Sequence, residues 1–467
     1  MQKVEIIDLP YQQNPESLFA SVRHLPDALW LDSGYPASSS SQFDIITAHP
    51  SITLETIGCV TTTVSLEGTK TSTEEPFSLC EQLFSSKKTD STYNDYPFAG
   101  GIAGYFGYDL GRKDNSALPK LDSLPDMRIG YYQWAIILDH FSKKSTILFN
   151  YDCPLGLKKE VLKCIHNRTQ NTVKKEENYN IDLFKTTQKK HYLSSVAKVK
   201  DYILAGDCYQ VNYAQHFSAK LKVDSWKLYK ELRKNLPAPY SCYYQLGNTK
   251  QAILSFSPER FIKLHGDKVE TKPIKGTARR GNDNKSDILQ AKGLINSEKN
   301  KAENLMIVDL LRNDLGKSCI PGTIKTPKLF ELQSFKNVHH LVSTVTGTIR
   351  KDQTALSLLR GCFPGGSITG APKKRAMEII DELEPCQRSV YCGTIGYIST
   401  AGRMDTNIAI RTLVIDGDNI HCWGGGGIVA DSNAEDEYQE IFDKIEPLIT
   451  SNSKQKKAEQ PLRPIDK

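Results

Sequence analysis

One lysine has surroundings that suit chemistry by an amine. Lys275 lies in the stretch TKPIKGTARRG between Ile274 and Gly276, and Arg279–Arg280 follow closely. An ordinary lysine has a pKa near ~10.4, so almost all of its amine is charged at pH 7. Burial beside Ile274, with two arginines nearby, lowers that pKa and yields a nucleophile or base, and Gly276 lets another molecule approach the backbone. The plain alternative is a surface lysine in a turn.

Acidic residues occur at helical spacing in two predicted helices. Glu303 precedes an apolar helical run, while Glu437, Glu440 and Lys444 fall on one face of a later helix. Four consecutive glycines, residues 424–427, come before that helix and expose backbone N–H groups. Carboxylates from two helices meeting at such a site suit a hard cation such as magnesium. The alternative is a solvated, salt-bridged helix face.

Three further features suggest a ligand that carries more than one carboxylate. Arg411 comes late in a predicted apolar strand, and a buried arginine needs an anion. Pro372 fits the first position of a helix, preceded by Thr369–Gly370, and a helix start attracts carboxylates. His340 is a candidate proton donor, although an isolated histidine is often structural. We therefore predict a small polycarboxylate held by magnesium, Arg411, Lys444 and backbone amides.

Alternating strand and helix patterns are expected to position these residues. Residues 1 to about 150 are mostly β, and residues 153–190 form a polar connector. The run Gln251–Glu270 predicts two strands around a Gly266–Asp267 turn, so that Lys275 follows as the chain leaves a sheet. The other predicted strands are Ala28–Asp32, Phe43–Ala48 and Cys208–Ala219, and the predicted helices are Leu157–Ile165, His191–Ala205, Trp226–Asn235 and Ser297–Leu315.

Composition excludes several classes of protein. The chain has 467 residues, enough for a large core, and its net charge of +6 is scattered along the sequence, which argues against nucleic-acid binding. Eleven cysteines without a Cys-x-x-Cys pair indicate reduced thiols. The first residues lack a signal core, and no apolar run is long enough to cross a membrane. A soluble, cytoplasmic protein is expected.

Five motifs together resemble the chorismate-utilising enzymes: ENLMIVDLLRNDLG, FPGGSITGAPKKRAMEIIDELEP, CGTIGY, IRT and GGGGIVADS. The resemblance runs from about residue 190 to 450, and the first part is similar to the N-terminal region of anthranilate synthase and aminodeoxychorismate synthase large components. It implies an α/β (α+β) fold, a two-sheet sandwich flanked by helices. The implied regions are 1–152, a connector at 153–190, a catalytic region at 191–450, and a disordered tail at 451–467.

The resemblance also implies roles for individual residues. Asn300 stands where relatives often carry an additional acid. The magnesium ligands would be Glu303, Glu437 and Glu440; the substrate would be held by Tyr391, Arg411, Lys444, Gly425, Gly426, Gly427 and Gln210; and Lys275, Glu259, His340 and Thr369 would lie at the reacting atoms.

Two positions indicate a subfamily. The stretch PIKGT around Lys275 resembles aminodeoxychorismate synthases, whereas anthranilate synthases have PIAGT. Gln210 stands where water-using relatives have a lysine base, so ammonia is the expected nucleophile. The implied reaction converts chorismate and ammonia to 4-amino-4-deoxychorismate through a covalent bond to Lys275. Because the chain has no Gly-x-Cys-x-Gly elbow, a separate glutamine amidotransferase is expected to supply the ammonia.

A second, non-catalytic pocket is also implied. Stretches that match tryptophan-binding segments of relatives contain Ser33, Ser40, Ser41, Gln42, Phe43, Pro239, Tyr240 and Ser241. Two alternatives to the subfamily assignment stay open at this point: an anthranilate synthase, and a non-catalytic sensor of chorismate or an amino acid.

Overall fold

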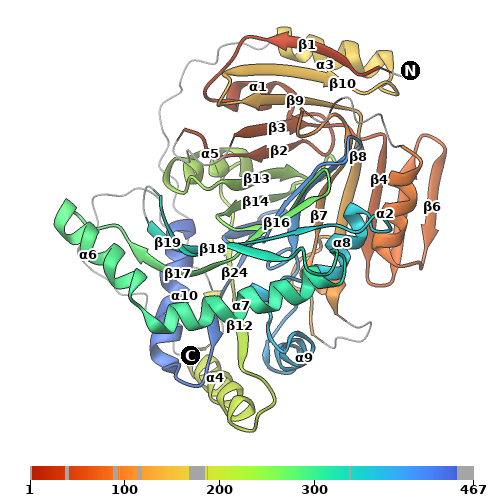
Figure 1. The fold of residues 1–467 in the computed structure, drawn as a ribbon. Helices are drawn as coiled ribbons and strands as arrows, with labels where there is room; N and C mark the ends of the chain where they lie inside the picture. Colours follow the sequence, from red (N-terminus) through yellow and green to blue (C-terminus); the bar gives the residue numbers. More distant parts are fainter. Residues whose placement is uncertain are drawn as a thin grey trace.

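Two large antiparallel sheets packed face to face form the body of the molecule (Figure 1). The computed structural model describes residues 3–36, 42–87, 93, 95–112, 118–167, 185–186, 188–335 and 338–449. In these residues each sheet contains 12 strands. The two-sheet sandwich with flanking helices that the resemblance implied is confirmed. The predicted tail at 451–467 lies outside the described residues.

The first sheet combines strands from the N-terminal region with strands from the second half of the chain. Its order is β1-β10-β9-β3-β2-β13-β14-β23-β24-β12-β11, and β20 also pairs with β12. The bounds are β1 Glu5–Leu9, β10 Lys144–Phe149, β9 Trp134–Asp139, β3 Phe43–Thr47, β2 Leu29–Asp32, β13 Tyr240–Gln245, β14 Gln251–Ser257, β23 Thr412–Asp416, β24 Asn419–Ile428, β12 Gln210–Lys220, β11 Lys185–Thr186 and β20 Gly370–Ala371.

The second sheet is mixed in the same way. Its order is β17-β19-β16-β15-β22-β21-β7-β8-β4-β5-β6, and β18 also pairs with β19. Each sheet thus contains strands from both sides of the domain boundary expected near residue 152. The boundary itself stays a prediction. The bounds are β17 Ile274–Arg279, β19 Val338–Thr348, β16 Lys268–Lys272, β15 Arg260–His265, β22 Met404–Asn407, β21 Thr394–Ser399, β7 Gly101–Phe106, β8 Met127–Tyr132, β4 Ile52–Ile57, β5 Val60–Ser65, β6 Gly68–Ser72 and β18 Lys325–Ser334.

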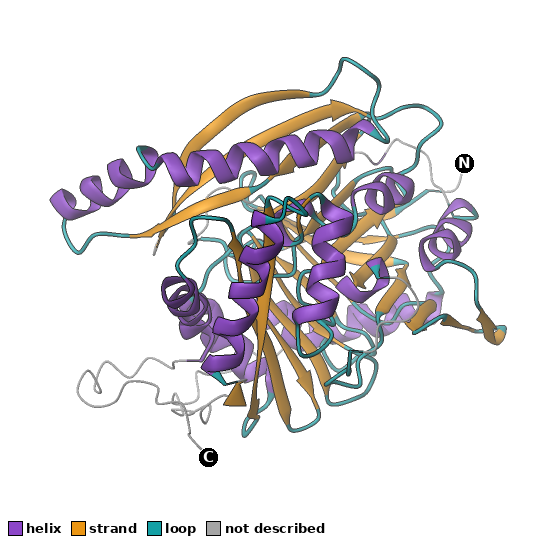
Figure 2. Ribbon diagram, turned by 90° about the horizontal axis from the view of Figure 1, so that it is seen from below, coloured by secondary structure: helices purple, strands orange, loops and turns teal. Residues whose placement is uncertain are grey.

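Helices cover the sandwich on its outer faces (Figure 2). Helices α4, α5, α9 and α10 pack on the first sheet, whereas α6 and α7 contact β17 and β19 of the second. The bounds are α1 Glu16–Val22, α2 Pro76–Ser85, α3 Leu155–His166, α4 Lys189–Leu204, α5 Ser225–Asn235, α6 Asn284–Ile295, α7 Glu298–Gly316, α8 Ala355–Cys362, α9 Lys373–Leu383 and α10 Ala434–Ile449, with short 3₁₀ turns η2 Tyr108–Gly111 and η3 Gly366–Ile368.

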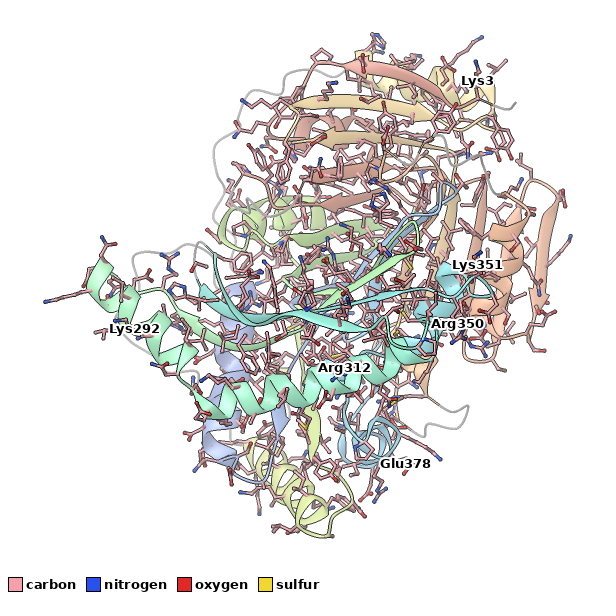
Figure 3. All side chains as sticks on the ribbon, viewed as in Figure 1. Lys3, Lys292, Arg312, Arg350, Lys351 and Glu378 are labelled. Carbon is pink, nitrogen blue, oxygen red and sulfur yellow. The ribbon has the colours of Figure 1, made fainter. Side chains whose placement is uncertain are left out.

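The core has two layers because the central strands are buried on both faces. Along β14, Ile253 packs into the cluster between the sheets, whereas Ala252 and Leu254 pack into the cluster beneath the outer helices. This alternation follows from the two-residue period of a strand. Charged side chains such as Lys292, Arg312 and Glu378 point outward (Figure 3). None of the described helices is long and apolar enough to cross a membrane.

A buried ion pair in the segment after α9 connects that segment to β12 and to η3. Arg388 is 0 % exposed, and its guanidinium lies 2.6 Å from the Glu384 carboxylate. Arg388 also donates to the carbonyl groups of Asn212 on β12 and Ile368 in η3, at 2.6 and 2.8 Å. The same Glu384 accepts the N–H of Ala214 on β12 at 2.8 Å. Since these bonds satisfy both buried charges, they fix η3 against β12.

The element boundaries required several corrections. The predicted strand pair Gln251–Glu270 contains three strands, because Pro258–Glu259 carries the chain from the first sheet to the second. Lys275 lies inside β17 instead of beyond the sheet, and Arg411 precedes β23 instead of ending a strand. Pro372 is the N-cap of α9, one position before the first helical residue.

Candidate active site

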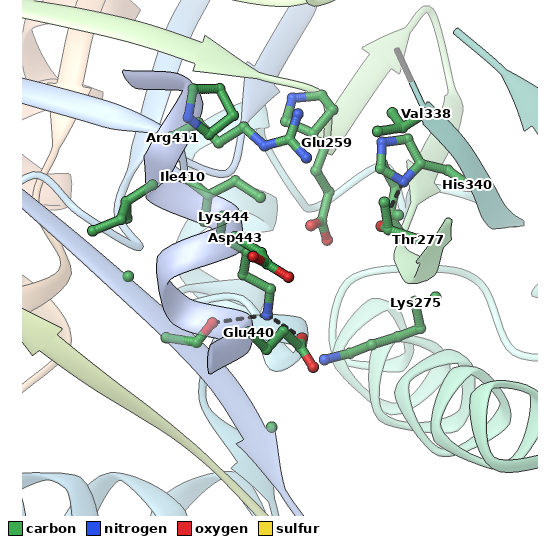
Figure 4. Close-up of a pocket in the computed structure, with 18 of the residues that line it drawn as sticks. Glu259, Lys275, Thr277, Val338, His340, Ile410, Arg411, Glu440, Asp443 and Lys444 are labelled. Carbon is green, nitrogen blue, oxygen red and sulfur yellow. Dashed lines mark hydrogen bonds and ion pairs between the residues drawn. The ribbon is translucent and has the colours of Figure 1, made fainter. Parts of the chain in front are cut away.

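One cavity of about 790 Å³ lies at the open end of the sandwich. Its walls come from β17, β19, α7, α10, β24, the turn after β14 and the segment before β23 (Figure 4). Most of the site residues predicted from the sequence line this cavity. They are Lys275, Glu259, His340, Tyr391, Arg411, Gly425, Gly427, Lys444, Glu303, Glu437 and Glu440.

Lys275 lies in an irregular part of β17. The register between β17 and β19 shifts between Ile274 and Thr277, and Gly276 has φ +88°. A Cβ at Gly276 would also lie 3.0 Å from the Asn300 side chain. The bulge therefore depends on glycine and turns the Lys275 side chain toward Glu440 across the cavity (Figure 4).

The pKa of the Lys275 amine is lowered, chiefly because the cavity wall removes it from water, although the Glu303 carboxylate opposes this. The charge of Lys444 lowers the pKa further, while Glu259 and Glu440 raise it. A lowered pKa increases the fraction of neutral, nucleophilic amine near pH 7.

Glu259 provides a carboxyl group that can hold a proton near neutral pH. Its side chain is 5 % exposed, and burial raises the pKa to about 7, against opposing contributions from Ser367 and Lys275. Ser367 Oγ donates to Glu259 Oε1 at 2.7 Å. A carboxyl group with this pKa can exchange a proton with a bound ligand, as general acid or base.

Lysines accompany the acidic residues on the opposite wall. Lys444 Nζ lies 2.6 Å from Glu440 and donates to the Gly425 carbonyl at 3.0 Å. Lys299 Nζ lies 3.7 Å from the Glu437 carboxylate. Glu303 has neither an ion pair nor a hydrogen bond within the described part, and burial raises its pKa. The wall therefore carries both the charges that bind a cation and those that bind an anion.

These carboxylates have the chemistry that magnesium prefers, since hard cations take oxygen ligands. Within the described residues, however, no group of three acidic, histidine or cysteine side chains forms a ready metal site. Glu440 and Glu437 each face a lysine instead. Magnesium would therefore require Lys444 and Lys299 to move from these carboxylates. Glu303, Glu437 and Glu440 fit the ion by donor type.

The glycines of β24 form an open edge beside Arg411. They lie within β24 and not after a strand as predicted, and β24 pairs with β23 only as far as Cys422. Arg411, with φ +50°, turns the preceding chain away. Because the Gly425 carbonyl accepts from Lys444, the backbone groups of Gly425 and, by alternation, Gly427 point away from β12. Their N–H groups thus face the cavity, as anion donors would.

Arg411 has no ion pair or side-chain hydrogen bond among the described residues, and burial lowers its pKa. An unpaired guanidinium in a cavity is a site for a carboxylate. Tyr391, 5 % exposed, stacks on Trp423 with ring centroids 6.2 Å apart. Burial raises its pKa well above the ordinary value, so the phenol stays a neutral hydrogen-bond donor.

His340 contacts β17. Its Nδ1 lies 2.8 Å from the Thr277 hydroxyl, and burial together with Arg411 lowers its pKa to about 3. The imidazole is therefore neutral at physiological pH. It can donate a hydrogen bond as a neutral ring, but it does not carry the extra proton of an imidazolium acid.

Three of the predicted residues are not among those that line the cavity. Thr369 is fully buried and donates to the Gly365 carbonyl at 3.0 Å. Gln210 is also fully buried, behind Gly427, and its amide has no hydrogen-bond partner among the described residues. A Cβ at Gly426 would point to Glu437, 3.1 Å away. The start of α9 does not line the cavity either.

Sequence reasoning missed three residues that matter to the site. Ser367 holds Glu259, Lys299 faces Glu437, and Asn212 lines the cavity. Ser367 lies inside the quoted motif FPGGSITGAPKK, so its hydroxyl was a visible signal. Lys299 and Asn212 carried none, because their roles depend on contacts between distant segments.

A second cavity of about 530 Å³ lies between the sheets near the N-terminal region. Five residues of the predicted tryptophan pocket line it: Gln42, Phe43, Pro239, Tyr240 and Ser241. Ser33 does not; it is buried, and its N–H donates to Asp44 at 2.6 Å. Ser40 and Ser41 lie outside the described residues.

Comparison with known proteins gave a consistent result. The family model of chorismate binding enzymes matches residues 28–450. The chain is 44% identical to "Aminodeoxychorismate synthase component 1" of Escherichia coli, covering 95% of this chain and 97% of that protein. It is 32% identical to "Anthranilate synthase component 1" of Acetivibrio thermocellus, over 94% and 92% of the two chains. A solved structure of anthranilate synthase component I from Streptococcus pneumoniae has a TM-score of 0.78 at 29% identity, covering 88% of this chain and 92% of that one.

The raised pKa of Glu259 predicts that this residue destabilises the fold at neutral pH. Since the pKa rises from 4.5 to about 7 on folding, the native chain retains a proton that the unfolded chain loses, and stability falls as pH rises through this window. Glu259→Gln should therefore be as stable as the parent chain near pH 4.5 and more stable above pH 7, by at most about 3 kcal/mol. Urea unfolding at several pH values measures this difference.

Glu270 supplies the matched control of opposite sign. Despite partial desolvation, Arg260 and Lys272 hold its pKa below the usual value. Glu270→Gln should lose stability above the ordinary carboxyl pKa. A Glu259→Gln variant that is equally stable or less stable than the parent at pH 8 would contradict the assignment of a raised pKa to Glu259.

Proposed function

This chain belongs to the chorismate binding enzyme family and is an enzyme that acts on chorismate; from that premise, we propose that it is the large component of an aminodeoxychorismate synthase. In this proposal it converts chorismate and ammonia to 4-amino-4-deoxychorismate, the precursor of 4-aminobenzoate in folate synthesis. Of the relatives named as aminodeoxychorismate synthase component 1, two are 44% and 43% identical to the chain and another is 34% identical, while two named as anthranilate synthase component 1 are 32% and 34% identical.

The observation that carries the proposal is the presence of Lys275 and Glu259 in the same cavity, where each affects the pKa of the other. Both line one cavity, and the pKa of each is moved toward neutrality, downward for the amine and upward for the carboxyl group. These two shifts favour a neutral amine and a protonated acid in the same cavity. A substitution that needs a nucleophile and an acid for the leaving group requires this combination.

In the first proposed step, the Lys275 amine attacks carbon 2 of the chorismate ring. The ring double bond shifts, the carbon-4 hydroxyl departs, and the Glu259 proton converts that hydroxyl to water. The new C–N bond replaces the C–O bond, and the lysine nitrogen gives one proton back to the Glu259 carboxylate. Splitting one displacement into two in this way lowers each barrier.

In the second step, ammonia attacks carbon 4 and the bond from carbon 2 to Lys275 breaks. The new nitrogen on carbon 4 loses one proton and becomes an amino group, and a proton passes through Glu259 to the lysine nitrogen, which leaves as a free amine. We propose that a separate glutamine amidotransferase subunit delivers the ammonia. The buried amide of Gln210, which cannot deprotonate water, is in keeping with ammonia as the nucleophile.

The substrate carboxylates have two proposed binding groups. Arg411 and the N–H groups of Gly425 and Gly427 would bind one of them. Magnesium, held by Glu303, Glu437 and Glu440, would screen and orient the other. Lys444, once displaced from Glu440, would then be free to pair with the substrate.

We also propose that the second cavity binds tryptophan. Phe43 and Tyr240 supply aromatic surface in its wall, and Arg260 lies over the Tyr240 ring at 5.0 Å from the centroid. Lys263 and Glu270 line the same space and provide charges of both signs for an amino acid. Tryptophan would act there as an inhibitor or as a fixed structural ligand.

Product analysis tests the proposed function. The purified chain with chorismate, magnesium and ammonium should form 4-amino-4-deoxychorismate, whereas glutamine should be used only after a separate amidotransferase is added. Anthranilate as the product would instead assign the chain to the anthranilate synthases. No turnover of either kind would favour the sensor. Glutamine-dependent turnover by the single chain would contradict the proposed partner.

The covalent step predicts a trapped adduct. With chorismate and magnesium but no ammonia, mass spectrometry should find the enzyme heavier by chorismate minus one water, with the label on Lys275. Lys275→Arg keeps the charge but offers no neutral amine, so it should form no adduct. An undiminished adduct in that variant, or an adduct on another residue, would show that Lys275 is not the nucleophile. The proposed metal site would not be affected by that result.

The proposed metal ligands can be tested without relying on activity alone. Glu303→Gln and Glu440→Gln should each abolish magnesium-dependent turnover and weaken magnesium binding by calorimetry, because each removes one of few carboxylates. Glu435→Gln, also on α10 but not among the residues that line the cavity, is the control and should bind magnesium as the parent does. A Glu303 or Glu440 variant with unchanged magnesium binding removes that residue from the site.

Tryptophan binding predicts a thermal shift. Added tryptophan should raise the melting temperature of the parent chain through preferential binding to the folded state. Phe43→Ala, which removes an aromatic wall of the second cavity, should reduce that rise. Absence of both a shift and a co-purified amino acid in denaturing mass spectrometry would reject the pocket.

A further inference from the structure

The position of Ser367 is restrained by contacts of the residues before and after it in the chain. It lies in η3, is 5 % exposed, and is preceded by Gly365–Gly366. A Cβ at Gly365 would lie 2.7 Å from Ile408, and one at Gly366 would lie 2.5 Å from Leu310. The two glycines therefore allow η3 to pack tightly between α7 and the strand that ends near Ile408. The buried Arg388 donates to the carbonyl of the next residue, Ile368, at 2.8 Å, and this bond further restrains the position of Ser367.

The partner of Ser367 is fixed as well. The Glu259 carbonyl accepts the N–H of Ile408 at 3.1 Å, and the Glu259 N–H donates to Ser257 Oγ at 3.2 Å. The side chain then meets the Ser367 hydroxyl, which donates to Oε1 at 2.7 Å. Both ends of this hydrogen bond are thus held by the backbone of different elements. Such preorganisation costs little when the reaction occurs.

We propose that Ser367 is a positioning residue for Glu259: its hydroxyl holds one carboxyl oxygen, so that the carboxyl group is presented to Lys275 and to the departing hydroxyl of the substrate. The inference rests on the proposed function for its catalytic part. Its physical part, the coupling of Ser367 to the charge on Glu259, can be tested without substrate.

Few titratable groups lie near Glu259, so a pH-dependent change in stability can be traced to this residue. Among the described residues, those that affect its pKa or are affected by it are Lys275 on β17 and Cys392 before β21, and burial raises the pKa of Cys392 to about 12. Cys392 therefore stays neutral between pH 5 and 9. Because burial also lowers the pKa of Lys275, the comparison needs a double-mutant cycle with Glu259→Gln.

The first experiment measures urea unfolding of the parent, Ser367→Ala, Glu259→Gln and the double variant from pH 5 to pH 9. The hydroxyl stabilises the ionised carboxylate, so Ser367→Ala should raise the pKa of Glu259 and lose more stability at pH 8 than at pH 5. With Gln at position 259 this pH-dependent part should vanish. A loss that is the same at every pH, or that persists in the double variant, would overturn the coupling.

The second experiment measures the rate of adduct formation without ammonia against pH. Ser367→Ala should be slower by about tenfold or more, and its basic limb should move upward by about one pH unit. Ser367→Thr, which keeps the hydroxyl, should restore both. Ser399→Ala removes a buried hydroxyl that accepts from Ala99 and Ala401 far from the cavity, and should leave the limb in place.

The outcomes separate the two proposals. A parent chain that forms no adduct at any pH contradicts the proposed function, while the unfolding cycle still decides the coupling. Ser367→Ala with a normal rate and an unmoved limb overturns the positioning role alone. If the alanine variant does not fold, Ser367→Cys, a weaker donor of similar size, should show an intermediate shift; an unshifted limb in that variant likewise overturns the role.

Discussion

The site depends on one steric constraint, the absence of side chains along β24. A Cβ at Gly424 would lie 2.8 Å from Ile441, and one at Gly426 would lie 3.1 Å from Glu437. Glycine at both positions lets α10 lie directly on the sheet, which carries Glu437, Glu440 and Lys444 to the cavity. On the opposite face a Cβ at Gly427 would meet the Gln210 amide at 2.7 Å. The same glycines thus set how closely both neighbours approach, and larger residues there would separate the acidic wall from Lys275.

Charge balance is the second organising feature. Glu440 pairs with Lys444 on the same helix, Glu437 lies near Lys299 of α7, and the Glu303 carboxylate raises the pKa of Lys275. Isolated charges in such a place would be costly, and a neighbour of opposite sign offsets that cost. A ligand that brings its own carboxylates and a cation can exchange partners with these residues without leaving a charge unpaired. We regard this exchange as the physical basis of substrate binding in the proposed reaction.

The sequence predicted much of the local structure, with errors at particular places. The helices near residues 191–205, 226–235 and 297–315 are observed as α4, α5 and α7, since their apolar spacing is strong. The prediction of two strands in Gln251–Glu270 was wrong, because the apolar pattern continues through Pro258–Glu259, where the chain passes from one sheet to the other. The predicted position of Arg411 late in a strand was wrong for a related reason. Its left-handed backbone before β23 cannot be recognised from the pattern of apolar residues.

The sequence by itself determined the family, through motifs whose residue types are chemically constrained, and with it the acids, the lysine and the glycine row. Only the tertiary structure decided which of these share a cavity, because β17, α7, β24 and α10 are far apart in the chain and meet through packing. It also decided that His340 is neutral, that Glu259 has a pKa of about 7, and that Ser367 holds it. These properties arise from burial and from partners on other segments, and no local pattern of residues encodes either one.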